Sequence, residues 1–345
     1  MTGQETVKAP KRWQFILRVL VSAALLAVLV IRLDLKQLLA LTVGIDWVWL
    51  IPPFLFFWIG MVITSYRWQA VLADFQIRER VGLLFWLTVL GFFWNNFLPS
   101  TVGGDGYRFL RLRARHPGRD AATFSSVFLD RVYGFLALLV FHFAFLPFYW
   151  RIVLHDPWLI WIEAAIILGT LTAIIVWMAR RRFASVSVKG EVGFARLLRD
   201  AFSKIQKVIG LIEQQRPVTF WRAGLYSLIF VLLNGLAFWC YFAALGEYPD
   251  LSLIVYTSTL AAVVGALPVT VNGLGLMEAV YLLLLISVGL GRESILLAAF
   301  LGRGLNLAIA IGSGIGFASE GFFSSFFKRG TDKIDGSPKK NDHAE

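Results

Sequence analysis

Charged residues and cysteine are both scarce in this sequence, and each scarcity excludes a class of protein. Only 16% of the 345 residues are charged, against about 25% in ordinary globular domains. So few charges cannot cover a water-soluble surface on a chain that is 58% hydrophobic. The single cysteine, Cys240, lies inside an apolar segment, which excludes a disulfide framework and a cysteine-based metal site.

Motifs for metal, nucleotide or nucleophile chemistry are also missing. The four histidines are scattered without the spacing of metal ligands, so we expect no metal and no other cofactor. There is no Walker A motif, no G-x-S-x-G and no Rossmann fingerprint. The net charge of +11 does not indicate nucleic-acid binding, because the basic residues lie between and beside apolar segments.

Long apolar runs are what the sequence has in abundance. About 20 apolar residues in a helix cross the hydrocarbon core of a bilayer. The segment 13–31 follows basic residues as a signal peptide does, but it is long and lacks a small-residue cleavage site, so we expect a retained helix. The chain is therefore predicted to be an all-α polytopic membrane protein with full spans at 13–31, 46–64, 124–150, 158–178, 220–246 and 294–322.

Two further apolar stretches are interrupted, 82–98 by a following glycine-rich turn and 251–289 by a break at 267–275. The basic residues concentrate in 65–81, 105–119 and 179–219 and at both ends of the chain. These all lie on the cytoplasmic side only if the two interrupted stretches are re-entrant hairpins, one entering from each face. The prediction is six full spans plus two hairpins with both termini cytoplasmic; eight full spans is the alternative.

The predicted organisation is a single membrane domain, 13–322, in the plasma (inner) membrane. It is preceded by a cytoplasmic N-terminus, 1–12, and followed by a polar, disordered cytoplasmic tail, 328–345. The basic segment 179–219 forms a cytoplasmic loop.

An internal repeat relates the two interrupted stretches. Leu98–Gly106 and Leu267–Gly275 share the pattern L-P-x-T-V-x-G-x-G, and F-L-D-R at 128–131 recurs as F-L-G-R at 300–303 with nearly the same spacing. The repeat units are 46–150 and 220–322, with one span between them, so the second unit is expected to be inverted. Inverted repeats with interrupted helices are a common transporter architecture.

The repeated motif has a physical explanation at membrane depth. Proline ends a helix and frees carbonyl groups, and glycine permits positive φ and close backbone approach. Freed backbone is tolerated there only where it is buried in protein or lines a polar cavity. We therefore expect both motifs to face a shared cavity, although two purely structural turns also explain them. The predicted turn residues are Pro99, Gly103, Gly104, Gly106, Pro268, Gly273 and Gly275.

Charged residues within the spans are candidate site residues. Arg131 and Arg303 occupy equivalent repeat positions and suit an anionic headgroup, because a guanidinium matches phosphate oxygens. Arg131 has a second explanation, since it is able to pair with Asp130 or reach the membrane surface. Asp105, Asp130 and Glu278 are each predicted as a proton-coupling group or a counter-ion.

The arginines that follow the first motif also admit two explanations. Arg108, Arg111 and Arg115 share one helical face, which suits phosphate binding beside a cavity. A generic contact with lipid phosphates at the cytoplasmic surface is the alternative. Arg108, nearest the motif, is the predicted substrate-binding residue. Asn95 and Asn96 are expected to satisfy the broken backbone.

On these residues the sequence resembles the flippase-like integral membrane family, which includes YbhN-type and AglD-type proteins and the membrane domain of lysylphosphatidylglycerol synthetases. The resemblance covers about 13–322 and implies translocation of lipids or lipid-linked intermediates between leaflets. Gly302, where the first copy has Asp130, departs from the internal symmetry. The resemblance assigns signature positions to Asn96, Pro99, Gly103, Gly104, Asp105 and Arg108, to Pro268, Asn272, Gly273, Gly275 and Glu278, and to Arg131 and Arg303.

The leading hypothesis is a flippase, and not an enzyme, for an anionic phospholipid or a polyprenyl-phosphate-linked lipid. Its substrate-binding residues would be Arg108, Arg131, Arg303, Asn96 and Asn272. A membrane enzyme acting on a lipid-linked sugar or phosphate, an accessory subunit for a partner enzyme, and a transporter of a soluble substrate are the alternatives. We expect no aminoacyl transfer, because the longest loop is too short for an aminoacyltransferase domain.

Overall fold

The computed structural model describes residues 12–31, 33–97, 103–182, 206, 208–267 and 269–318. The predictions for Pro99, Pro268, the tail 328–345 and most of the loop 179–219 fall outside these residues.

Helices account for the regular structure, and the described residues contain no strand. This confirms the predicted all-α class. The helices are α1 (Arg12–Ile31), α2 (Leu35–Val43), η1 (Trp47–Leu50), α3 (Ile51–Asp74), α4 (Val81–Phe97), α5 (Gly103–Arg115), α6 (Asp120–His155), α7 (Pro157–Arg182), α9 (Pro217–Ala243), α10 (Leu251–Gly265), η2 (Val271–Gly273), α11 (Leu276–Leu285), η3 (Ile286–Val288) and α12 (Arg292–Ala318).

Six helical segments in the described part of the chain are long and apolar enough to cross a membrane, which confirms a polytopic membrane protein. Five of them correspond to predicted spans: Trp47–Asp74, Asp120–His155, Pro157–Met178, Pro217–Ala243 and Arg292–Ile315. The sixth, Val271–Val288, reaches its length only by joining η2, α11 and η3. α11 alone has 10 residues, about 15 Å of helix, or half of the hydrocarbon core. The predicted first span forms α1, whose apolar described part is the shorter Ile16–Leu29.

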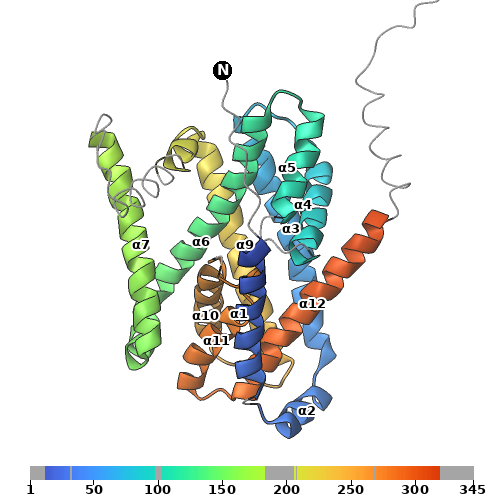
Figure 1. The fold of residues 1–345 in the computed structure, drawn as a ribbon, viewed down its shortest axis with the longest axis vertical. Helices are drawn as coiled ribbons and strands as arrows, with labels where there is room; N and C mark the ends of the chain where they lie inside the picture. The colour runs from blue at the N-terminus through green and yellow to red at the C-terminus, as the bar shows by residue number, and fades with distance from the viewer. Residues whose placement is uncertain are drawn as a thin grey trace, which may run out of the picture.

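Both predicted hairpins are present as pairs of packed helices. α4 packs against α5, and α10 packs against α11. Figure 1 shows α4 and α5 in the upper half of the molecule and α10 and α11 in the lower half, while α6, α7 and α12 extend through much of its height. The inverted repeat and the re-entrant nature of the hairpins stay predictions, because no membrane defines the two faces.

The helix contacts pair the two repeat units element by element. α3 and α9, the first helices of the units, pack extensively along each other. The contact of α4 with α12 has its counterpart in α10 with α6, and that of α3 with α6 has its counterpart in α9 with α12. The largest buried apolar cluster joins α6, α9, α10, α11 and α12, and a second surrounds Trp68 between α3, α4, α5 and α6. Each hairpin is therefore held by helices of both units.

Candidate functional site

The two helices of the first hairpin, α4 and α5, approach each other closely at Gly91 and Gly104. A Cβ added to Gly104 would lie 1.9 Å from the carbonyl oxygen of Gly91 on α4, so only glycine fits. The backbone N–H of Gly104 donates to Asn95 Oδ1 at 2.8 Å. This bond satisfies a free donor at the start of α5. Asn95 therefore ties the two limbs together, as expected, whereas Asn96 donates to the carbonyl of Phe92 in its own helix.

The turn of the second hairpin uses left-handed backbone and rests on α1. Asn272, Gly273 and Gly275 have φ values of 51°, 69° and 81°. A Cβ on Gly275 would lie 2.5 Å from Cβ of Leu25 in α1. Ser22 of α1 also accepts a hydrogen bond from the backbone N–H of Val271 at 2.9 Å. The predicted turn residues Gly273 and Gly275 thus carry conformations that other residues rarely adopt.

A buried carboxylate and an arginine complete the second turn. Glu278, in the first turn of α11, accepts the backbone N–H of Gly275 at 2.8 Å and the Nε–H of Arg303 at 2.5 Å. Arg303 also donates to the carbonyl oxygens of Asn272 at 3.4 Å and Gly273 at 3.3 Å. The broken backbone is therefore satisfied by one ion pair. The side chain of Glu278 is 1% exposed and that of Arg303 is 26% exposed.

The first turn carries the equivalent pair. Asp105, in the first turn of α5, forms an ion pair with Arg131 of α6. The side chain of Asp105 is 13% exposed and that of Arg131 is 47% exposed. In both halves an acid near the start of the second hairpin helix binds the arginine of the following long helix. In both halves the arginine is the more exposed partner, so part of each arginine side chain remains accessible.

Asp130 lies beneath the first pair and is held by two other arginines. Its Oδ1 accepts from Nε of Arg67 at 2.6 Å and its Oδ2 from Nη2 of Arg108 at 2.9 Å. Arg108 also stacks over the ring of Trp68 at 3.9 Å and lies 3.7 Å from Asp105. The side chain of Asp130 is 2% exposed. Asp130 is thus a counter-ion of Arg67 and Arg108.

In the described part of the first half, the charged groups form one connected network. Arg67, Arg108 and Arg131 face Asp105 and Asp130, whereas Arg303 and Glu278 balance each other in the second half. Among the described residues, Nε of buried Arg108 has no hydrogen-bond partner. An excess cation in a protein interior favours an anionic ligand, because the ligand supplies the missing compensation.

Arg67 is the site residue that sequence reasoning did not single out. It was counted among the basic residues of the loop 65–81, but α3 continues through this segment to Asp74. Arg67 is buried there and also donates to Ser227 of α9 at 3.0 Å. The run of polar residues from Thr64 to Gln69 in an otherwise apolar helix was the available signal.

The remaining arginines after the first motif do not share the environment of Arg108. Arg111 is exposed and lies over Tyr107, with 5.5 Å between the guanidinium carbon and the ring centroid. Arg113 pairs with Asp120 at 2.9 Å, and Arg115 pairs with Glu79 at 2.8 Å. Only Arg108 of this series turns inward.

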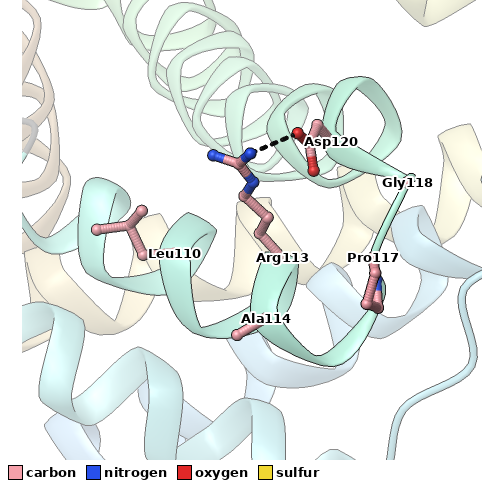
Figure 2. A pocket seen from close by; sticks show the side chains of 6 residues that line it. All are labelled: Leu110, Arg113, Ala114, Pro117, Gly118 and Asp120. Atoms are coloured by element: carbon pink, nitrogen blue, oxygen red, sulfur yellow. Dashed lines mark ion pairs between the residues drawn. The ribbon is translucent and has the colours of Figure 1, made fainter.

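A surface hollow lies where α5 turns into α6. Figure 2 shows its lining and the ion pair that bridges it; the lining residues are Leu110, Arg113, Ala114, Pro117, Gly118 and Asp120. Arg131 is eleven residues beyond Asp120 on α6, about 16 Å along the axis. The hollow is therefore separate from the buried ion pairs.

Comparison with known proteins places this arrangement in a family. Residues 15–314 match the family model described as the lysylphosphatidylglycerol synthase TM region. The chain belongs to this family. The match includes both hairpins and every residue of the two ion-pair clusters. A search of curated proteins gave no match.

Membership confirms the resemblance and the integral membrane character of this lysylphosphatidylglycerol synthase TM-region protein. It associates the chain with lipids in a membrane.

Proposed function

We propose that this protein moves a lipid with an anionic phosphate headgroup between membrane leaflets, without a chemical step on the lipid. The phosphate would belong to a phospholipid or to a polyprenyl-phosphate-linked lipid. Its headgroup would pass between the hairpins while the hydrocarbon tail stays in the bilayer. The protein would lie in the plasma (inner) membrane with both termini cytoplasmic.

The observation that carries the proposal is the matched pair of arginines, Arg131 and Arg303. Each is held by an acid of a hairpin turn, and each remains partly exposed. A phosphate group is able to form charge-assisted hydrogen bonds with an arginine that is already oriented by a carboxylate. Because one arginine belongs to each repeat unit, a headgroup would meet an equivalent cation from either leaflet.

The connected cluster in the first half supports a preference for anions. Arg67 and Arg108 are buried on Asp130, and their network includes Asp105 and Arg131. Its described members are three arginines and two carboxylates, so a phosphate would meet several positive groups in one place. A zwitterionic or uncharged headgroup would gain less from the same groups.

Reconstitution in liposomes tests the proposal. The purified full chain would be assayed for headgroup transfer between leaflets with anionic phospholipids, a polyprenyl phosphate and a zwitterionic phospholipid in separate arms. We expect transfer in at least one phosphate-bearing anionic arm and slower transfer of the zwitterionic lipid. No transfer in any arm would refute the proposal, and a chemically modified headgroup would favour a membrane enzyme.

Substitution of the two arginines makes the test specific. Arg131→Gln and Arg303→Gln should each slow transfer about tenfold, because a hydrogen bond to a charged group contributes about 1.5–3 kcal/mol. Arg151→Gln is the matched control, because Arg151 is an exposed arginine on the same helix as Arg131. Equal rates in all three variants would show that the paired arginines do not bind the headgroup.

A further inference from the structure

A second buried polar network lies where α7 joins the rest of the molecule. His142 of α6 has Nε2 at 2.8 Å from Oε2 of Glu163 on α7, and Tyr256 of α10 donates its hydroxyl to Oε1 of Glu163 at 2.7 Å. His142 and Tyr256 have no exposed surface, and Glu163 is 2% exposed. The consecutive helices α6 and α7 thus meet α10 at one ionisable pair, which neither ion-pair cluster of the hairpins includes.

The network continues toward the surface through stacked rings. The ring of Tyr256 stacks with His142, 5.4 Å between centroids, and with Tyr149, 5.3 Å. Tyr149 donates its hydroxyl to Asp250 at 2.8 Å and contacts Ser252. Asp250 is exposed at the start of α10. Tyr149 and Asp250 are thus two further titratable groups that these contacts connect to the pair.

The hydrogen bonds of the network indicate which atom would bind a proton. If Glu163 is ionised, its oxygens accept hydrogens from His142 Nε2 and Tyr256 Oη. His142 Nδ1 then carries a lone pair, and this buried atom has no hydrogen-bond partner in the described part of the chain. A proton at Nδ1 converts a buried cluster of charge −1 into a neutral imidazolium–carboxylate pair.

We propose that His142, Glu163 and Tyr256 form a proton-binding site whose loading and release drive lipid translocation. The coupling to lipid movement rests on the function proposed above, whereas proton binding does not. Asp105 and Glu278 suit this role less, because each already holds an arginine. The site also includes part of a hairpin between which the headgroup would pass, since Tyr256 belongs to α10, the first helix of the second hairpin. Proton gain or loss changes the hydrogen bonds that join this limb to α6 and α7.

Proton binding is measured first, without any added lipid substrate. The full chain in nanodiscs would be titrated between about pH 5 and pH 8, following histidine nitrogen shifts and the infrared band of protonated carboxyls. We expect one titration that disappears in His142→Gln or Glu163→Gln. Tyr256→Phe removes only a hydroxyl and should shift that titration, which guards against variants that fail to fold. If no titration in the wild type depends on His142 or Glu163, the proposal is wrong.

Coupling is measured in liposomes with a pH difference of about one unit across the membrane. One proton per lipid should shift the steady-state distribution of lipid between leaflets about tenfold, and His142→Gln and Glu163→Gln should abolish the shift. His116→Gln is the matched control, because His116 pairs with Glu79 at 3.0 Å in a more exposed position. Translocation without any pH response in the wild type would overturn the coupling but not the proposed function. Titration without translocation would support the proton site and refute the proposed function.

Discussion

Buried charges in this protein are compensated by ion pairs, and Asp130 compensates two arginines at once. The carboxylate of Asp130 accepts hydrogen bonds from both Arg67 and Arg108. Removing one partner of a buried charge pair costs about 3–5 kcal/mol, because the remaining charge loses its compensation. Asp130→Asn should therefore lower the thermal stability of the detergent-solubilised protein strongly. Asp120→Asn, which breaks the exposed pair with Arg113, should cost at most about 1 kcal/mol; equal effects would contradict the buried network.

Glycine positions in the repeated motif are not equivalent. Gly104→Ala would place Cβ against the backbone of Gly91, where no side chain can give way. We expect a loss of folded protein or a large fall in unfolding temperature. Gly106→Ala has open space around it within α5, so it should be neutral or stabilise by up to about 1 kcal/mol. Thermal unfolding of both variants checks the contrast, and a tolerated Gly104→Ala would refute the close approach.

Charged residues are predictable as site residues where their neighbours in the sequence already indicate a role. Arg131 and Arg303 were identified because the repeat aligns them, and Glu278 because it follows a motif. Arg67 and Glu163 were not identified, since each is an isolated charge within an apolar stretch and its partner lies on another helix. Such pairings depend on helix packing, which the order of residues does not specify.

Elements were predicted well wherever the bilayer decides their length. Hydropathy placed the long helices, but it ended the second span at 64, whereas α3 continues to Asp74. α6 likewise extends from Asp120 to His155 beyond the predicted 124–150. The apolar run in the sequence ends where the chain leaves apolar surroundings, whereas the helical hydrogen bonds continue beyond that point. The short helix α2 was missed in the connection 32–45, because nine residues are too few for a spanning signal.

The start of α10 provides a pH-dependent prediction at this scale. Hydrogen bonds from the Ser252 hydroxyl and the backbone N–H of Leu253 lower the pKa of Asp250, the N-cap of α10. Because the pKa of Asp250 is lower in the folded protein than in the unfolded chain, ionised Asp250 stabilises the fold at pH values above the ordinary aspartate pKa. This stabilisation is lost as the pH falls through the pKa of Asp250 in the folded protein. Asp250→Asn keeps a capping side chain but loses the charge, so it should be less stable than the wild type at neutral pH. Unfolding temperatures should converge below about pH 4; a constant difference would contradict the assignment.

Across the whole molecule, the two repeat units share a plan but not a charge distribution. Their turns carry equivalent acid–arginine pairs, Asp105 with Arg131 and Glu278 with Arg303. At Gly302, where the first unit has Asp130, an added Cβ would lie 2.8 Å from the ring of Tyr241. An aspartate there would have to displace this ring, and with glycine at this position the second unit has no counterpart of Asp130.

The arrangement of the hairpins in the membrane gives the prediction with the widest consequence. If α4 and α5 form a re-entrant hairpin, the segments before α4 and after α5 lie on the same side of the bilayer; with eight full spans they lie on opposite sides. Arg78→Cys and Pro117→Cys, made singly in a Cys240→Ala background, place a thiol at exposed positions on either side of the hairpin.

A membrane-impermeant thiol reagent applied to intact cells should label neither position, and both should react after permeabilisation. Tyr248→Cys, exposed before α10, is the control and should react in intact cells, because the second hairpin enters from the other face. Labelling of Pro117→Cys but not Arg78→Cys in intact cells would establish eight spans, and the two acid–arginine pairs would then no longer lie at the tips of opposed hairpins.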